Sequence, residues 1–332
     1  MIVKDMMPGF ELYQPTQLDD ALALLDRYGK DGWKMAGGND SLSWFKERVK
    51  RPKAVIDISG IAALKGVRET PDGVEIGALT TLTEIERNPV IRAKYRVLAD
   101  AARRVASPQI RNTGSIGGNL AQDARCWYYR YGLPCYRAGG NTCFADTPEG
   151  VNREHALFDS DRCIAVSPSD TAPALVALDA KFVVRSSKGE RVVGTDEFFI
   201  GPKTDITHLT SVQPQEMLTA IRIPKTWAGS RFYFEKVADR ETWDFALVNV
   251  AAAIVVTNGT IERCRVACGG VSAVPRRLTV VEEVIKGKSQ DADIAKLAGQ
   301  AAVRGAKPVN YNQFKIPLMA NLVTRAVRDA TA

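Results

Sequence analysis

Four cysteines follow a glycine-rich run within one segment of this 332-residue chain. The run is GSIGGN at 114–119, and the cysteines are Cys126, Cys135, Cys143 and Cys163. A glycine-rich turn lets backbone N–H groups approach a phosphate, whereas four thiolates can hold an iron–sulfur cluster or a zinc ion. The surrounding residues, 107–170, are mostly irregular by pattern, and so long an irregular stretch is expected to be functional or held by a ligand. The segment therefore predicts a nucleotide cofactor close to a metal site.

The spacing of the four cysteines does not specify the metal. Zinc sites usually pair ligands as C-x2–4-C, and ferredoxin-type clusters use tighter runs than the one seen here. Iron, zinc and ordinary buried thiols therefore all stay open on the residues alone. The other two cysteines, Cys264 and Cys268, lie in an apparent strand and turn and are expected to be small buried hydrophobic residues.

A second glycine pair occurs in KMAGGNDSL at 34–42, between an expected strand at 33–36 and a helix-like segment. Glycines at such a turn allow close backbone approach, and the N–H groups of the next turn face a phosphate. Neither glycine segment has the G-x-G-x-x-G or the G-K-[ST] pattern, so neither a Rossmann nor a P-loop site is predicted. Each turn alone is as well explained by a structural loop, but two in one domain favour a dinucleotide.

Two charged residues further along the chain are candidates for cofactor contact. Asp170 ends the segment SPSD at 167–170, just before an expected helix, where it would be either a helix N-cap or a ligand of a ribose or ring. Lys236 lies at an expected strand end, where it would be either solvated or placed to stabilise negative charge on a flavin. The two histidines form no hydrolytic motif, so the cofactors are expected to carry the chemistry.

Charge and hydropathy narrow the class of protein. The net charge of +7 comes from scattered basic residues, and no zinc-finger spacing or RNP-like motif supports nucleic acid, so no nucleic-acid partner is predicted. No apolar run approaches the roughly 18 residues of a membrane helix, and residues 1–13 lack the apolar region of a secretory signal. We therefore expect no membrane span and a cytoplasmic location, or a periplasmic one through export with a signal-bearing partner.

The periodicity changes near Ala228–Gly229. Before this point short strands and helices alternate, as in a mixed α/β arrangement, whereas after it three strands precede three helices. Asn258 and Gly259 form a strong hairpin signal between the last two strands. The sequence predicts an α+β fold with domains at 1–228 and 229–332. The expected strands after the boundary are at 231–237, 247–257 and 260–267, and the helices are at 279–286, 294–302 and 314–329.

Five segments in order resemble the FAD-binding medium subunit of the xanthine oxidase, or molybdenum hydroxylase, family. They are AGGNDSL at 36–42, GSIGGNL at 114–120, SPSDTAPALVALDA at 167–180, MLTAIRIP at 217–224 and FYFEKVADRETWDFALVNVAAAI at 232–254. The resemblance implies an FAD-binding domain of the vanillyl-alcohol-oxidase or PCMH type at 1–228. It further implies a smaller C-terminal domain of the CO dehydrogenase flavoprotein type at 229–332, with an antiparallel sheet and a helical layer.

The resemblance also implies which residues contact FAD. Ser115 stands where many relatives carry threonine, which keeps the hydroxyl group. The implied FAD-contacting residues are Lys34, Met35, Ala36, Gly37, Gly38, Asn39, Asp40, Ser41, Leu42, Gly114, Ser115, Gly117, Gly118, Asn119, Asp170, Leu218 and Lys236.

Most medium subunits pass directly from the second of these segments to the third, but here residues 122–165 intervene and hold the four cysteines. This insertion resembles that of the FAD subunits of 4-hydroxybenzoyl-CoA reductase and of periplasmic aldehyde oxidoreductases, in which it binds a [4Fe–4S] cluster. The resemblance implies that Cys126, Cys135, Cys143 and Cys163 are the cluster ligands, with Cys163 set apart by the longest spacing.

By this resemblance the chain is an electron-transfer oxidoreductase subunit with FAD and a [4Fe–4S] cluster and without catalytic residues of its own. A small subunit with two [2Fe–2S] clusters and a large molybdenum-cofactor subunit would complete the complex. The large subunit would hydroxylate an aldehyde or aromatic heterocycle, or reduce an aromatic thioester. Electrons would pass to or from an external carrier such as ferredoxin, quinone or cytochrome. Two alternatives stay open: a free-standing vanillyl-alcohol-type flavin oxidase and a zinc-stapled, non-catalytic module.

Overall fold

The computed structural model describes residues 7–331. The outer ends of the two expected domains, residues 1–6 and 332, lie outside the described residues. A small parallel sheet comes first, in the order β1 (Glu11–Tyr13), β3 (Ala54–Asp57) and β2 (Gly32–Met35). Helix α1 (Leu18–Tyr28) packs on this sheet through apolar side chains at helical spacing, namely Ala21, Leu22 and Leu25.

The second sheet is antiparallel and has five strands in the order β4–β5–β8–β6–β7. Because β8 is added between β5 and β6, residues from the two ends of the predicted FAD-binding domain pair with each other, as Ile76 does with Ile221. The strands are β4 (Val67–Thr70), β5 (Gly73–Gly77), β6 (Lys181–Ser186), β7 (Gly189–Val193) and β8 (Met217–Pro224).

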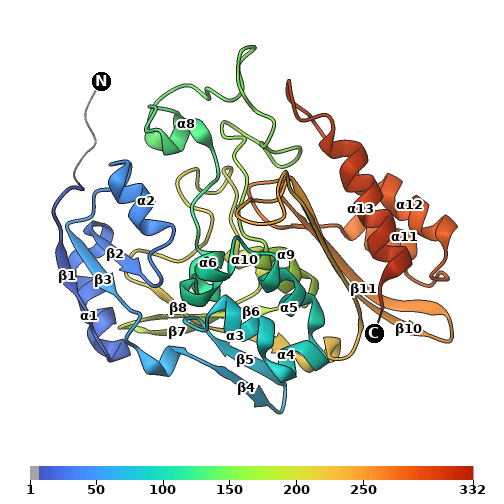
Figure 1. Ribbon diagram of the computed structural model, residues 1–332, viewed down its shortest axis with the longest axis horizontal. Helices are drawn as coiled ribbons and strands as arrows, with labels where there is room; N and C mark the ends of the chain where they lie inside the picture. The colour runs from blue at the N-terminus through green and yellow to red at the C-terminus, as the bar shows by residue number, and fades with distance from the viewer. Residues whose placement is uncertain (1–6, 332) are drawn as a thin grey trace.

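Short helices lie over one side of this sheet, and Figure 1 shows them between it and the C-terminal strands. They share one hydrophobic core with the sheet, in which Phe182 stacks on Phe198 with ring centroids 4.0 Å apart. The helices of this part are α3 (Leu82–Arg87), α4 (Pro89–Lys94), α5 (Arg96–Arg103), α6 (Pro108–Thr113), α7 (Ile116–Leu120), α9 (Thr171–Ala177) and α10 (Thr195–Phe198).

A four-stranded antiparallel sheet and three helices make up the C-terminal part. The strand order is β12 (Arg276–Arg277), β11 (Thr260–Gly269), β10 (Val248–Thr257) and β9 (Arg231–Val237). Figure 1 shows the three helices side by side against this sheet. They are α11 (Thr279–Ile285), α12 (Ala292–Ala302) and α13 (Lys315–Asp329). The strands-then-helices order matches the sequence prediction, and the α+β class is confirmed.

Strand β10 joins the two halves because both of its faces are buried. Ala251 and Ala253 belong to the core shared with α9, whereas Ala252 and Ile254 belong to the core under the C-terminal helices. Successive side chains of a strand point to opposite faces, so a fully apolar strand is expected where both faces are covered. The expected domain boundary falls between β8 and β9, and its position stays a prediction.

The hairpin between β10 and β11 has the turn that its sequence predicts. Thr257 pairs with Thr260, and the two residues between them, Asn258 and Gly259, have φ of 52° and 78°. A two-residue turn with positive φ at both positions matches the right-handed twist of the strands, and Asn-Gly is the pair that adopts it at least cost.

The cysteine insertion at 122–165 is a run of loops with one short α-helix, α8 (Trp127–Arg130), and a 3₁₀ turn at Tyr136–Ala138. Figure 1 shows it between α2 (Ser41–Lys46) and the C-terminal helices. Its later part is anchored to the C-terminal core, where Leu157 and Phe158 are buried and both donate backbone N–H groups to the Val271 carbonyl. The irregular stretch is therefore held by both halves of the molecule.

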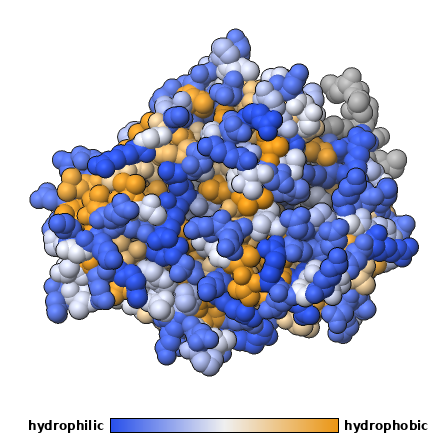
Figure 2. Space-filling model, turned by 180° about the vertical axis from the view of Figure 1, so that it is seen from behind, coloured by the Kyte–Doolittle hydropathy of each residue, from blue (hydrophilic) through white to orange (hydrophobic). Residues whose placement is uncertain are grey.

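Within residues 7–331, no helix combines the length and the apolar character that a membrane crossing requires. Figure 2 shows the face behind that of Figure 1, where hydrophilic side chains surround separate hydrophobic patches. Two exposed apolar residues, Val280 and Leu297, lie on α11 and α12. The helical layer of the C-terminal part therefore keeps some apolar surface in contact with solvent.

Candidate functional site

The two glycine-rich loops are in direct contact. A Cβ atom on Gly37 would lie 2.1 Å from the Thr113 carbonyl oxygen, so only glycine fits here. Asn39 Nδ2 donates a hydrogen bond to Thr113 Oγ1 at 3.1 Å. Gly38 has φ of +74°, a left-handed conformation that glycine adopts without strain. The sequence predicted two phosphate-type loops, and the structure brings them together at one place.

The second loop forms the start of α7. Ser115 is the N-cap, and its Oγ accepts a hydrogen bond from the Gly118 backbone N–H at 3.1 Å. The Gly117 N–H donates to the Ala78 carbonyl at 2.8 Å, and a Cβ on Gly117 would also lie 2.8 Å from that oxygen. The glycines therefore let this loop lie against the end of β5.

Asn119 connects the second loop to the segment around Asp170. Its Oδ1 accepts hydrogen bonds from Ser169 Oγ at 2.7 Å and from Thr171 Oγ1 at 2.6 Å, and all three side chains are buried. The sequence did not single out Ser169 or Thr171. The only signal available was the pair of hydroxyl residues on either side of Asp170.

Asp170 and Lys236 form a buried ion pair, with 2.6 Å between Oδ2 and Nζ. Asn249 Nδ2 donates to the other carboxylate oxygen at 2.8 Å. Burial raises the pKa of Asp170, and Lys236 and Asn249 oppose that rise. Asp170 occupies the N-cap position of α9 but its side chain makes no cap hydrogen bond, and Lys236 is buried rather than solvated.

A small pocket adjoins this ion pair. Its polar lining includes Arg125, Ser167, Asp170 and Asn249. The Asn249 Oδ1 atom is buried without a hydrogen-bond partner among the described residues. An orphaned buried acceptor beside a pocket is the arrangement expected where a polar ligand supplies the missing donor.

Lys34 and Leu218 take other positions. Lys34 Nζ donates to the backbone carbonyls of Gln213, Pro214 and Glu216, so it is bonded to the 213–216 segment. Burial lowers the pKa of Lys34 to about 8. Leu218 lies in β8 within the main hydrophobic core. Neither side chain takes part in the hydrogen bonds that join the two glycine loops.

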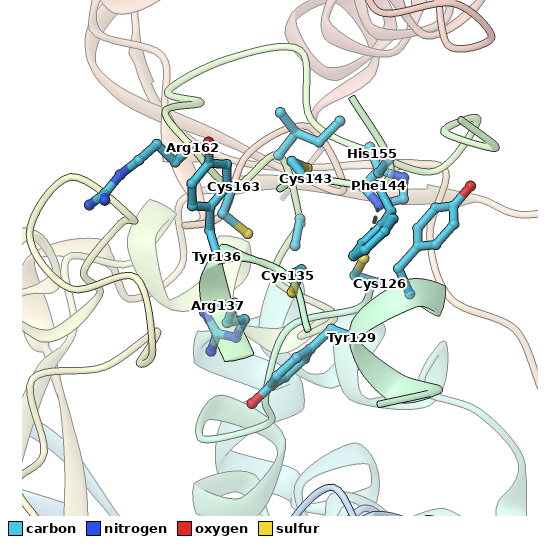
Figure 3. Close-up of a pocket in the computed structure, with 14 residues that line it drawn as sticks. Cys126, Tyr129, Cys135, Tyr136, Arg137, Cys143, Phe144, His155, Arg162 and Cys163 are labelled. Atoms are coloured by element: carbon cyan, nitrogen blue, oxygen red, sulfur yellow. Dashed lines mark hydrogen bonds between the residues drawn. The ribbon is translucent and has the colours of Figure 1, made fainter. Parts of the chain in front are cut away.

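All four cysteines of the insertion line one small pocket. Figure 3 shows the sulfur atoms of Cys126, Cys135, Cys143 and Cys163 around a common space. Cys126 and Cys135 are buried, whereas Cys143 and Cys163 are half-buried, and all are free thiols. Cys264 and Cys268 are also free and buried in the C-terminal core, as predicted.

The four thiols interact electrostatically. Burial raises the pKa of Cys126 to about 12, and Cys163 and Cys135 add to that rise. The pKa values of Cys143 and Cys163 are raised as well, again chiefly by burial. Thiols with raised pKa are protonated at neutral pH, so a metal cation would have to displace these protons to obtain thiolate ligands.

The pocket contains four cysteine thiols as possible metal ligands. Within residues 7–331, no three His, Cys, Asp or Glu side chains lie close enough together to bind one metal ion. In a [4Fe–4S] cluster each cysteine holds a different iron, so its four sulfurs stand further apart than the ligands of one zinc ion. The four thiols that line the pocket supply the ligand type and number of such a cluster.

Two polar side chains that the sequence did not single out border this pocket. Arg137 is buried and donates to the backbone carbonyls of Ile206 at 2.6 Å and Thr207 at 2.8 Å, and it pairs with Asp123. His155 Nε2 lies 3.4 Å from Cys126 Sγ. Burial, together with the charges of Lys315 and Arg125, lowers the pKa of His155 to about 4. No local motif marks either residue, because the fold brings them to the pocket.

The first glycine loop contacts the insertion. Asp40 Oδ2 accepts from Trp44 Nε1 at 3.0 Å, and its Oδ1 lies 2.7 Å from Arg130 Nη2 of α8. The Trp44 ring packs on Tyr129, with centroids 5.3 Å apart, and Tyr129 lines the cysteine pocket. The loop at 36–42 is thus connected to the cysteine pocket through two aromatic rings and an ion pair.

Two family models match this chain. The model described as the FAD binding domain in molybdopterin dehydrogenase matches residues 8–226, and the CO dehydrogenase flavoprotein C-terminal domain matches residues 233–330. Together they account for the two halves described above.

Individual relatives agree with these matches. The chain is 28% identical over 330 residues to the carbon monoxide dehydrogenase medium chain of Hydrogenophaga pseudoflava, covering 98% of each. It is 33% identical over 302 residues to the aldehyde oxidoreductase FAD-binding subunit of Escherichia coli K12, covering 90% of this chain and 91% of the relative. A solved carbon monoxide dehydrogenase from Hydrogenophaga pseudoflava superposes with a TM-score of 0.79 at 27% identity, covering 98% of both chains. The chain therefore belongs to the FAD-binding medium subunits of the molybdenum hydroxylase family and is an FAD-dependent oxidoreductase subunit.

Proposed function

We propose that this subunit holds a [4Fe–4S] cluster in addition to FAD, and that it transfers electrons within a heteromeric molybdenum hydroxylase. The observation that supports the cluster is the placement of Cys126, Cys135, Cys143 and Cys163 around one pocket. When bound, FAD exchanges electrons in pairs or singly, whereas an iron–sulfur cluster exchanges them singly.

For FAD, we propose that the two glycine loops hold the pyrophosphate together, with backbone N–H groups donated by the first loop, because those of Gly117 and Gly118 in the second loop already bond Ala78 and Ser115. The contact between Gly37 and Thr113 and the packing of Gly117 on Ala78 support this role, because both loops need glycine to lie so close. The proposed contacts are residues 34–42, Gly114, Ser115, Gly117, Gly118, Asn119, Asp170, Leu218 and Lys236. Asn249, which bonds Asp170, joins this set because its buried Oδ1 has no partner among the described residues.

For the cluster, the insertion supplies four thiols and shields them. Cys126 and Cys135 are buried, and the rings of Tyr129 and Phe144 line the pocket beside them. The buried guanidinium of Arg137 borders the same pocket and would offset part of the negative charge of four thiolates. The protein therefore provides ligands, a largely dry surrounding and a positive charge.

The two alternative functions receive less support. A zinc ion needs four ligands at tetrahedral distances, and no three suitable side chains within residues 7–331 are that close. A free-standing flavin oxidase would need its own substrate pocket and base, whereas this chain matches a medium subunit over both halves. Turnover of a substrate by the purified chain alone would favour the oxidase.

We propose that the partners are a small subunit with two [2Fe–2S] clusters and a large molybdenum-cofactor subunit, with ferredoxin, quinone or cytochrome as the external acceptor. The medium-chain relatives support the assembly. On the surface, the rings of Trp127, the first residue of α8, and of Tyr131, the residue after its end, lie close to Cys126 in the sequence. These rings stack with centroids 6.2 Å apart and are 51% and 63% exposed. Exposed aromatic rings of this kind are enriched at protein interfaces.

Metal and flavin analysis of two matched variants tests the cluster assignment. Cys135→Ser removes a proposed ligand, whereas Cys264→Ala removes a buried thiol of the C-terminal core. The first variant is expected to lose iron, inorganic sulfide and the visible absorbance of the cluster while it retains FAD. The second is expected to keep all of them. Unchanged iron in Cys135→Ser would overturn the assignment.

A further inference from the structure

His155 is a buried residue of the insertion whose ring faces a proposed ligand. Its side chain is 1% exposed, and Nε2 lies 3.4 Å from Cys126 Sγ. Figure 3 shows the two side chains next to each other at the edge of the pocket. The other ring nitrogen, Nδ1, is buried and has no hydrogen-bond partner among the described residues. The Cys126 sulfur is therefore the polar neighbour that this ring is positioned to bond.

The backbone around His155 is fixed by the C-terminal half. The His155 carbonyl accepts hydrogen bonds from Asn312 Nδ2 at 3.1 Å and from Lys315 Nζ at 3.0 Å. Lys315 is fully buried at the start of α13 and also donates to the Gly270 carbonyl at 2.8 Å. These bonds fix the His155 backbone from which the buried ring reaches Cys126.

The ligand state of Cys126 determines the tautomer of the ring. A thiolate ligand carries no hydrogen and can only accept, so a hydrogen on Nε2 has an acceptor. A hydrogen on Nδ1 would instead leave two electron-rich atoms, Nε2 and Sγ, facing each other. Because a buried acceptor that lacks a donor costs about 1–3 kcal/mol, the Nε2–H tautomer is favoured.

We propose that His155 donates its Nε2–H to the Cys126 sulfur and thereby raises the reduction potential of the cluster. This inference rests on the proposed [4Fe–4S] site. A hydrogen bond to a ligating sulfur stabilises the reduced, more negative cluster more than the oxidised one. His155 acts through Cys126, so it is a positioning residue that tunes the cluster.

Isotope labelling makes the bond directly observable, because the chain contains only two histidines, His155 and His208. His208 is on the surface and bonds Asp205. The full chain is labelled with ¹⁵N-histidine, and its reduced cluster is examined by pulsed electron paramagnetic resonance. A weak ¹⁵N coupling is expected in the unmodified chain and in His208→Gln, and it should disappear in His155→Leu.

The midpoint potential of the cluster is the second readout. His155→Leu should shift it to a more negative value, whereas His208→Gln should leave it unchanged. An intact cluster without ¹⁵N coupling, a coupling as strong as that of a directly bound ligand, or an unchanged potential in His155→Leu would each overturn the inference. If the His155→Leu variant loses its cluster, the ¹⁵N coupling in the unmodified chain still decides whether the histidine bonds the cluster ligand. A chain without iron would instead refute the proposed function. Metal analysis detects this case separately from the role of His155.

Discussion

Arg130 and Asp40 form an ion pair, with 2.7 Å between Nη2 and Oδ1, that joins the helical turn of the cysteine insertion to the first glycine loop. The Arg130 guanidinium also lies over the Trp44 ring, 4.0 Å from its centroid. The two ends of this contact belong to the two proposed cofactor sites. The pair therefore links the shape of the proposed FAD loop to the position of the insertion.

Arg130→Leu tests this link. Loss of a half-buried ion pair and of the stacking on Trp44 is expected to lower the free energy of unfolding by about 1 kcal/mol. The rate of FAD release, measured as the rise in flavin fluorescence after dilution, should increase. Arg68→Leu, which removes an exposed ion pair with Glu75 on the distant β4–β5 hairpin, is the matched control and should release FAD at the normal rate. Equal rates in both variants would contradict the link.

Gly37→Ala tests the contact between the glycine loops. The added methyl group would lie 2.1 Å from the Thr113 carbonyl oxygen, so the loops must separate. We expect a loss of about 1–3 kcal/mol in stability and a clear decrease in bound FAD, measured by flavin absorbance of the purified chain. Gly194→Ala adds the same group where no atom lies within 4 Å and should change neither property. Normal FAD content in Gly37→Ala would show that the loops need not touch.

Lys236→Met tests the buried ion pair. Without the Lys236 ammonium group, the Asp170 carboxylate would be buried without its counter-charge, so unfolding in urea should require about 3–5 kcal/mol less free energy. The double variant Asp170→Asn with Lys236→Met removes both charges and is expected to recover part of this loss. If the double variant were destabilised by the sum of the two single effects, the two residues would not be coupled.

Lys315 gives a prediction about pH. Burial lowers the pKa of Lys315 in the folded chain to about 7, whereas in the unfolded chain the pKa returns to its ordinary value near 10.4. Between these two values the unfolded chain binds the extra proton, so this residue makes the folded state more stable as pH rises from about 7 towards 10. The difference in unfolding free energy between the unmodified chain and Lys315→Met should therefore change across this range. A constant difference would show that Lys315 stays charged when folded.

Sequence patterns predict the secondary structure where local chemistry determines it. The Asn258–Gly259 turn, helix α1 and the strands-then-helices order of the C-terminal half follow from turn residues and from apolar periodicity. Residues 93–105 look helical in the sequence, but the structure interrupts them at Tyr95, whose φ of −141° separates α4 from α5. Strand β1 was missed because three residues carry too little pattern and its pairing with β3 comes from a distant part of the chain.

The site was predicted in outline but not in its contacts. The glycine segments and the four cysteines are visible in the sequence because each is a local cluster of one residue type. The environments of Lys236 and His155 depend on segments more than 60 and 150 residues away, respectively, so no local pattern could show that these side chains are buried. The burial of such residues can be recognised only from the tertiary contacts around them.

Mössbauer spectroscopy of the ⁵⁷Fe-labelled full chain, purified without oxygen and combined with iron and FAD quantitation, tests whether this subunit holds a [4Fe–4S] cluster beside FAD. The spectrum of a [4Fe–4S] cluster and four irons for each FAD are expected. FAD without iron, or zinc in place of iron, would contradict this assignment.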